Sequence, residues 1–164
     1  STLMRSSAAS DVYKRQILKY RERFATVGWL ENEVYPGMPE LLDRLCQAGK
    51  TMMVATSKPE VFARKILDHF QLAAYFSFVG GATLDGVRST KEEVIDYVLK
   101  TNEVVSLSEV IMVGDRKFDI LGAKHAGVSS VGCVYGYGSR EELETAGADY
   151  VVDSIGELQN LLLP

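Results

Sequence analysis

The sequence predicts an α/β fold in which helices cover both faces of an open parallel sheet. Short strands that are apolar along their whole length alternate with amphipathic helices, and a strand without a polar face must be buried on both sides. Three helix starts carry the capping-box pattern, in which a Ser or Thr is followed three residues later by Glu. These starts are Thr90, Ser139 and Ser154.

Residues 1–16 contain four serines and show no sustained apolar periodicity, so they cannot bury enough surface to fold alone. We expect them to lie outside the fold, either as a non-native leader or as a disordered tail. From Ile17 to Leu30, apolar residues recur at three- and four-residue spacing. This spacing predicts an amphipathic helix that ends before Pro36.

The remaining elements follow in alternation. An apolar stripe from Met38 to Cys46 predicts a helix that Gly49 ends. Residues 51–55 form a short apolar strand, and Pro59 opens the next helix, where its missing N–H costs nothing. Further strands are predicted over residues 75–79, 110–113, 130–134 and 150–152, and further helices around 94–99 and over about 116–126, 140–146 and 155–162.

Composition restricts the function. The 164 residues carry 18 Lys and Arg against 22 Asp and Glu, a net charge of −4, whereas nucleic acids require a cationic surface. No apolar run approaches the roughly 20 residues that span a bilayer, so we expect a cytoplasmic protein with no nucleic acid or membrane as partner. The two cysteines, Cys46 and Cys133, lack metal-binding spacing and are expected to be reduced thiols.

In a parallel α/β sheet, ligands bind beyond the carboxyl ends of the strands. Asp115 follows the strand 110–113, and Asp119 comes one helical turn later. Asp115 alone fits a helix N-cap, but two carboxylates on one face repel each other unless a cation lies between them. Mg²⁺ is one such cation, and the side chain of Arg116 or Lys117 is another.

Two further positions carry candidate binding residues. Lys91 lies in the first turn of a helix, where the helix dipole is already positive, so we expect it to face an anion. Otherwise it is solvated beside Glu92 or paired with Asp96. Thr56 and Ser57 lie between a strand end and a helix N-terminus, where free backbone N–H groups can hold a phosphate. Such hydroxyls also cap helices without any ligand.

Together, Thr56, Lys91 and the pair Asp115 and Asp119 resemble motifs two, three and four of the haloacid dehalogenase-like (HAD) hydrolases over roughly residues 17–164. Thr90-Lys-Glu-Glu-Val-Ile95 is similar to the 5′-nucleotidase-like members of that superfamily. Other segments resemble its phosphoglycolate phosphatase-like branch: Tyr35-Pro-Gly-Met-Pro39, Ala55-Thr-Ser-Lys-Pro59, Val113-Gly-Asp-Arg-Lys-Phe-Asp119, Gly122-Ala-Lys-His-Ala-Gly127 and Tyr135-Gly-Tyr-Gly-Ser-Arg-Glu-Glu-Leu143.

The resemblance implies a three-layer Rossmann-like fold and a Mg²⁺-dependent phosphomonoester hydrolase. Its substrate would be phosphoglycolate, a nucleoside monophosphate or another small phosphorylated metabolite, which an aspartate attacks to form an aspartyl-phosphate. Thr56 and the Ser57 N–H would hold the phosphoryl oxygens, and Lys91 would pair with the phosphate and the nucleophile. Asp115 would bind Mg²⁺ directly, and Asp119 would bind it or fix its waters.

The family's first motif, Asp-x-Asp-Gly-Thr, which supplies the nucleophile, does not occur in this sequence. We therefore expect the carboxy-terminal part of a longer phosphatase, inactive as it stands. Residues 17–34 would be the last helix of a cap domain, and residues 35–164 an incomplete core without its central strand. Two alternatives stay open: a catalytically silent phosphate- or partner-binding module, and a phosphomutase of the same superfamily.

Overall fold

The computed structural model describes residues 14–23, 26, 28 and 32–164. The chain divides into two compact units, Ser1–Glu33 and Val34–Pro164. In the first unit, residues 14–23 and 26 are helical, which confirms the described part of the helix predicted over 17–30 and extends it back into the expected leader. Residues 1–13 of that leader, and residues 24–25, 27 and 29–30 of the predicted helix, lie outside the described residues.

The first half of the second unit contains two strands and three helices in the predicted order. They are α2 (Met38–Gln47), β1 (Met53–Pro59), α3 (Glu60–His69), β2 (Phe78–Ala82) and α4 (Lys91–Thr101). β1 and β2 pair in parallel. α4 begins with a complete capping box, because Thr90 Oγ1 accepts from the Glu93 N–H and the Glu93 carboxylate accepts from the Thr90 N–H.

The second half contains three strands and three helices. They are β3 (Ile111–Gly114), α5 (Lys117–Ala126), β4 (Ser129–Cys133), α6 (Arg140–Ala146), β5 (Tyr150–Val152) and α7 (Ile155–Leu162). The bounds of α6, β5 and α7 are those that the sequence predicts. The Ser139 and Ser154 hydroxyls begin α6 and α7 by accepting from backbone N–H groups, which satisfies one free donor of each first turn.

The strand predicted over 75–79 is wrong by three residues. Residues Ala73–Tyr75 form a 3₁₀ turn, and β2 runs on through Gly80 and Gly81 to Ala82. These glycines continue the strand because helices press directly on it. A Cβ on Gly80 would lie 2.3 Å from a Val98 methyl of α4, and a Cβ on Gly81 would lie 2.7 Å from the Glu60 backbone of α3.

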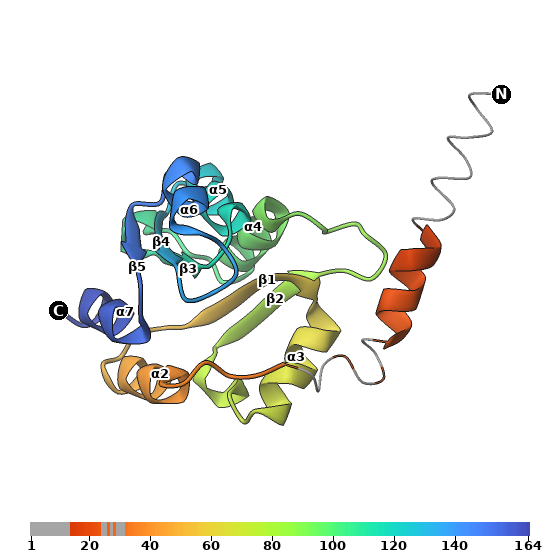
Figure 1. Cartoon of the computed structure of the whole chain (residues 1–164), viewed down its shortest axis with the longest axis horizontal. Helices are drawn as coiled ribbons and strands as arrows, with labels where there is room; N and C mark the ends of the chain where they lie inside the picture. The colour runs from red at the N-terminus through yellow and green to blue at the C-terminus, as the bar shows by residue number, and fades with distance from the viewer. Residues whose placement is uncertain (1–13, 24–25, 27, 29–31) are drawn as a thin grey trace. The chain divides into compact units, whose positions relative to one another are not determined.

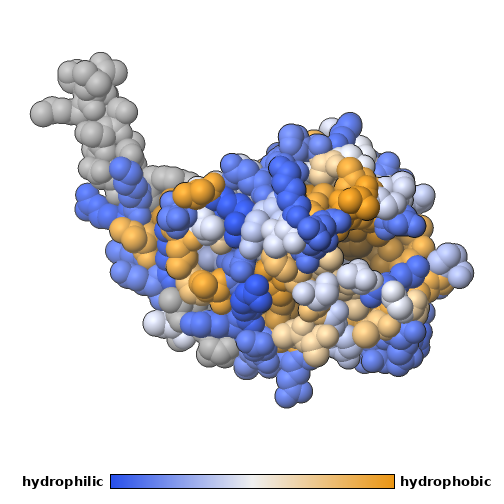
Figure 2. Space-filling model, turned by 180° about the vertical axis from the view of Figure 1, so that it is seen from behind, coloured by the Kyte–Doolittle hydropathy of each residue, from blue (hydrophilic) through white to orange (hydrophobic). Residues whose placement is uncertain are grey.

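The parallel strands form two sheets rather than one continuous sheet. One sheet has the order β1-β2 and the other the order β3-β4-β5. The residues of β3 are all half-buried, and those of β1 are half-buried except for one exposed position, whereas β2 and β4 are each buried over four residues. Figure 2 shows apolar surface gathered around a hollow on one face of the molecule. β1 and β3, which each lie at an edge of their sheet, therefore carry apolar side chains that are only partly covered.

Helices cover both faces of the strands, which confirms the predicted α/β class. In the second unit, α4, α5 and α6 pack side by side on one face, and α2, α3 and α7 lie on the other (Figure 1). A buried apolar cluster lies between α2, α7 and the strands β4 and β5. It consists of Leu41, Leu45, Val131, Cys133, Val152 and Leu158.

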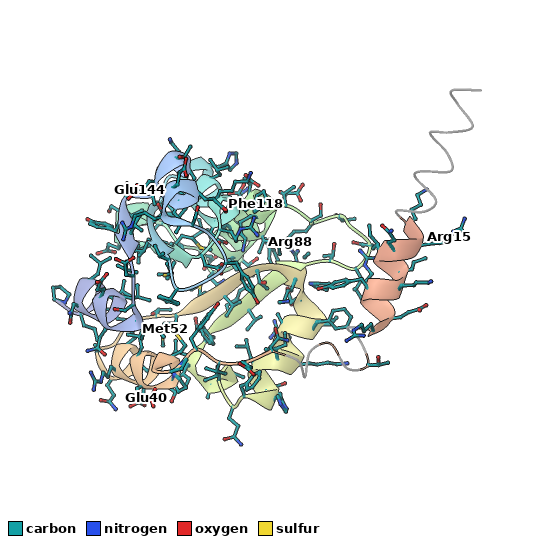
Figure 3. All side chains as sticks on the ribbon, in the orientation of Figure 1. Arg15, Glu40, Met52, Arg88, Phe118 and Glu144 are labelled. Atoms are coloured by element: carbon teal, nitrogen blue, oxygen red, sulfur yellow. The ribbon has the colours of Figure 1, made fainter. Side chains whose placement is uncertain are left out.

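Arg88, labelled in Figure 3, fastens the β1-β2 sheet to its helices. Its Nε donates to the Gly81 carbonyl at 2.8 Å, its Nη2 lies 3.3 Å from Glu60 Oε2, and its guanidinium stacks 3.6 Å from the centre of the Tyr97 ring. One side chain thereby joins β2, α3 and α4. Planar stacking combined with hydrogen bonding is a use that suits Arg better than Lys.

Two other predictions concern the chain as a whole. Both cysteines are free thiols, as predicted, and Cys133 is buried. Within residues 14–23, 26, 28 and 32–164, no helix has the length and apolar character that crossing a membrane requires.

Candidate active site

Lys91 lies at the centre of the candidate site. Its Nζ is 2.8 Å from Asp119 Oδ1 and donates to the Ala55 carbonyl at 3.0 Å. Only 11% of the Lys91 side chain and 8% of the Asp119 side chain are exposed. The prediction that Lys91 faces an anion is therefore confirmed, and its pairing with Asp96 is wrong, because the carboxylate it meets comes from α5.

α4 and α5 approach closely enough for this pair because Gly122 has no side chain. A Cβ on Gly122 would lie 2.7 Å from Ile95 Cδ1 and 3.0 Å from Lys91 Cγ. Lys91 reaches from the first turn of α4 to the first turn of α5, where Asp119 lies. The glycine thus sets the helix spacing that lets the ammonium and the carboxylate meet away from water.

Asp119 also holds the turn between β3 and α5. Its Oδ2 accepts hydrogen bonds from the backbone N–H groups of Asp115 and Arg116, both at 3.1 Å. A Cβ on Gly114 would lie 2.2 Å from Asp119 Cβ, so the carboxylate fits under the turn only because glycine precedes Asp115. Lys91 and two N–H groups therefore engage both oxygens of Asp119.

The sequence left open whether the side chain of Arg116 or that of Lys117 neutralises the two carboxylates. The structure pairs the Arg116 guanidinium with another acid, Glu142, and places the Lys117 ammonium 5.3 Å from the centre of the Phe118 ring. Glu142 Oε1 accepts from Arg116 Nε at 2.9 Å and from the Lys117 N–H at 2.8 Å. The Lys117 N–H and then the Arg116 guanidinium lower the pKa of Glu142. A carboxylate at the N-terminus of α5 also complements the helix dipole.

Asp115 is half-buried and directs one carboxylate oxygen toward a loop. Its Oδ2 accepts from the Tyr137 N–H at 2.8 Å, and its backbone carbonyl accepts from the Gly138 N–H at 2.8 Å. Within the described part of the chain, no donor hydrogen-bonds to its Oδ1. The N-cap residue of α5 is Arg116, so the interpretation of Asp115 as a helix cap is wrong, and one of its oxygens is available.

Thr56 and Ser57 extend β1 beyond the predicted strand end, because the strand continues to Pro59. Thr56 Oγ1 accepts from the Lys58 N–H at 3.1 Å, and α3 begins at Glu60. Thr56 is half-buried and Ser57 is exposed. Burial lowers the pKa of Lys58. The Lys91 ammonium donates to the carbonyl of Ala55, the residue before Thr56, so it lies next to this turn.

Two tyrosines, Tyr35 and Tyr135, lie close to Asp115. The Tyr35 and Tyr135 rings meet edge to face with centroids 5.3 Å apart. Burial, and then the negative charge of Asp115, raise the pKa of Tyr35. Burial, and then a hydrogen bond with the Cys133 thiol, raise the pKa of Tyr135. Both phenols therefore stay neutral and offer only polar hydroxyls and ring edges beside the carboxylate.

The acidic residues fit a divalent ion only as part of a larger ligand set. Among the described residues, no three His, Cys, Asp or Glu side chains gather closely enough to form a metal site. Asp115 offers its uncommitted oxygen, whereas both oxygens of Asp119 are engaged. Mg²⁺ takes six oxygen ligands and commonly keeps several waters. One carboxylate that binds the ion directly and one that orients a bound water would therefore supply part of its ligand set.

A family model described as haloacid dehalogenase-like hydrolase matches residues 2–133. The chain belongs to that family. The match starts within the expected leader, whose separation from the fold stays a prediction.

Two of the curated relatives are a 5′-nucleotidase and a phosphoglycolate phosphatase. A 5′-nucleotidase of Pseudomonas aeruginosa is 43% identical over 143 residues, which are 87% of this chain and 64% of that protein. A phosphoglycolate phosphatase of Vibrio parahaemolyticus is 36% identical over 154 residues, 92% of this chain and 67% of that protein. The chain thus spans about two thirds of the length of these relatives.

Solved HAD structures share the fold. The crystal structure of a "predicted phosphatase" from Clostridium acetobutylicum has a TM-score of 0.87 and 46% sequence identity, and the match covers 90% of this chain and 68% of that one. A hydrolase from Streptococcus pneumoniae matches with a TM-score of 0.85 at 24% identity. The second likeness, at low identity, supports the α/β architecture alone.

Proposed function

We propose that this chain is the phosphate- and metal-binding part of a Mg²⁺-dependent phosphomonoester hydrolase that works through an aspartyl-phosphate. The observation that carries the proposal is the position of Lys91, whose ammonium joins the Ala55 carbonyl to the Asp119 carboxylate. Three segments that are far apart in the sequence thereby meet beyond the end of β3 and at Ala55, where the regular pairing of β1 with β2 is interrupted. Ligands of α/β sheets bind at such edges.

In this proposal, Thr56, Ser57 and Lys91 bind the phosphoryl group. The Thr56 hydroxyl and the Ser57 N–H donate to phosphoryl oxygens, and the Lys91 ammonium supplies the opposite charge. Because Lys91 is nearly buried and fixed by Asp119, its ammonium is held in place before a substrate arrives. A fixed charge in a site of low dielectric stabilises a dianion more strongly than a solvated lysine does.

Asp115 and Asp119 have different tasks toward the metal. Asp115 would hold Mg²⁺ through its uncommitted oxygen, and Asp119, whose oxygens are engaged by Lys91 and two N–H groups, would orient a metal-bound water. Bound Mg²⁺ shields charge so that an anionic nucleophile can approach a phosphate. With so few ligands from this chain, we expect millimolar affinity or weaker, and less still after substitution of both carboxylates by Asn.

The nucleophile does not come from this chain, because the sequence contains no Asp-x-Asp. We propose that it lies on a strand outside the given sequence that pairs between β1 and β3. Residues 17–34 would then be the last helix of a cap domain and residues 35–164 the rest of the core. The chain alone is expected to be inactive.

The substrate class we propose is a small phosphomonoester such as phosphoglycolate or a nucleoside monophosphate. The names of two relatives, a phosphoglycolate phosphatase and a 5′-nucleotidase, support this class without choosing between them. A cytoplasmic location and the absence of nucleic-acid and membrane partners stay predictions from the composition.

Reconstitution tests the proposal. The chain is co-expressed with the part of the Pseudomonas relative that the match does not cover, and the purified complex is assayed with p-nitrophenyl phosphate and Mg²⁺. We expect hydrolysis that Thr56→Val and Lys91→Met each reduce by at least about 100-fold, since removing one preorganised donor costs that much. Thr51→Val and Lys50→Met, exposed positions next to β1, are matched controls that keep the rate.

A catalytically silent phosphate-binding module is the second candidate, favoured by the absence of any Asp-x-Asp in this chain. It predicts a complex that binds phosphate in calorimetry, loses that binding with Lys91→Met, and hydrolyses nothing. A complex whose hydrolysis is unaffected by Thr56→Val and Lys91→Met would contradict both candidates.

A further inference from the structure

We propose that the loop Tyr135–Gly138 is a positioning element for Asp115, which holds that carboxylate in the one orientation that leaves Oδ1 open toward a metal ion. The proposal rests on the function proposed above, since it assigns a role toward the same metal site. The loop belongs to the segment Tyr135–Leu143 that resembles the phosphoglycolate phosphatase-like branch, but it lies outside the matched motifs two, three and four.

The loop makes two hydrogen bonds to Asp115. The Tyr137 N–H donates to Asp115 Oδ2 at 2.8 Å, and the Gly138 N–H donates to the Asp115 carbonyl at 2.8 Å. Backbone and side chain of Asp115 are thus fixed together. A carboxylate held at one oxygen by a charge-assisted bond keeps its rotamer, and its second oxygen then points in a constant direction.

Asp115 also explains why the loop contains two glycines. A Cβ on Gly136 would lie 2.3 Å from Asp115 Cβ and 2.3 Å from its Oδ2, and a Cβ on Gly138 would lie 2.2 Å from the Asp115 carbonyl oxygen. Neither glycine has a positive φ, so no torsion in the loop demands glycine. The absence of both side chains serves the close approach to Asp115.

The loop itself is anchored on the opposite side. The Gly136 N–H donates to the Cys133 carbonyl at 3.3 Å, and the Val134 N–H donates to the Val152 carbonyl of β5 at 2.9 Å. The Tyr135 ring packs against Tyr35. The loop therefore fixes Asp115 relative to β4 and β5. The Tyr137 side chain is 88% exposed and takes no part in this anchoring.

Metal affinity measures this role directly, without turnover. Tb³⁺ binds oxygen sites, and nearby tyrosines can sensitise its luminescence, so Tb³⁺ is titrated into the full chain and then displaced by Mg²⁺. We expect Gly136→Ala and Gly138→Ala to weaken binding about tenfold, as the loss of partners that orient a metal ligand does. Gly156→Ala is the matched control, because its Cβ would meet only Ser154 Oγ at 3.7 Å and affinity should be unchanged.

Two comparisons separate the possible failures. If Asp115→Asn remains folded and leaves Tb³⁺ binding intact, the metal site of the proposed function is wrong. If Asp115→Asn remains folded and loses binding while both loop variants keep it and remain folded, the metal site stands and the positioning role is wrong.

A stability cycle decides the case in which a loop variant unfolds. The three atoms nearest to a Cβ on Gly136 all belong to the Asp115 side chain, so Gly136→Ala should lower the melting temperature in the native background and not in an Asp115→Gly background. An equal loss in both backgrounds would overturn the proposal, because the clash would then have another source.

Discussion

Lys91 Nζ lies 2.8 Å from Asp119 Oδ1, and both side chains are nearly buried. The same ammonium donates to the Ala55 carbonyl in β1, while Asp119 belongs to α5, which packs on β3 and β4. The pair therefore links the two sheets of the unit through the layer of α4 and α5. A desolvated pair of this kind is costly to break from one side.

Removing one partner of this pair should destabilise the chain strongly. We expect Lys91→Met or Asp119→Asn to lower the free energy of unfolding by about 3–5 kcal/mol, since the remaining charge is left buried. Urea titration of the complex with the co-expressed amino-terminal segment measures the change, because the chain alone is expected to be only marginally stable. Asp153→Asn, which breaks the exposed Arg140–Asp153 pair, should cost at most about 1 kcal/mol. A loss of that small size at Lys91 would show that water reaches the pair.

The chain alone should not hydrolyse phosphomonoesters, because it contains no Asp-x-Asp to supply a nucleophile. Incubation with p-nitrophenyl phosphate and Mg²⁺ should release p-nitrophenol at the rate of the buffer control. A robust rate that Asp115→Ala abolishes would refute this prediction and require a nucleophile within the given sequence.

The unit should be only marginally stable on its own. β1 and β3 each pair on one side only, and each buried backbone group left without a partner costs about 1–3 kcal/mol, against about 5–15 kcal/mol for a whole domain. We expect a broad or low thermal transition, raised by co-expression with the segment that carries the first motif. A sharp, reversible transition above about 60 °C, high for a mesophilic domain, in a monomeric sample would contradict this.

Acid should weaken the chain in part through Glu142. Its pKa is lowered by the Lys117 N–H and then by Arg116, so its contribution is complete above the ordinary Glu value of about 4.3 and is lost as the pH falls through the lowered pKa. Glu142→Gln should lower the melting temperature at pH 7 and flatten its decline between about pH 5 and pH 3. Glu141→Gln, an exposed neighbour, should retain the decline of the native chain.

Local signals predicted most of the elements. The bounds of α6 and α7 agree with the prediction because Ser139, Gly147 and Ser154 mark their ends with capping residues that act within a few positions. β2 was misplaced for the opposite reason. Its glycines are required by a side chain of α4 and by the backbone at the start of α3, and no property of the strand's own sequence indicates them.

In the candidate site, too, the local sequence predicted some features, and others depend on contacts between distant segments. The spacing of Asp115 and Asp119 led us to expect a compensating cation. Asp119 meets one in Lys91, which lies 28 positions earlier and on another helix, whereas a metal ion at Asp115 stays a prediction. The close approach of Gly136 and Gly138 to Asp115 is likewise a long-range contact. A pair of glycines soon after an apolar strand is the one signal in the sequence that could have directed attention to this loop.

The packing of α2 against α7 brings the beginning and the end of residues 34–164 together. Arg44 Nη1 donates to Gln159 Oε1 at 2.9 Å across this contact. The two helices run in the same direction, because Gly37 lies next to Ile155 and Arg44 contacts Gln159, so a linker that returns along α7 would join the two ends. New ends could be opened near Val105, which is 92% exposed and lies between the two sheets in the sequence. Such a circular permutant would synthesise β3-β4-β5 before β1-β2 and keep the same neighbours in space.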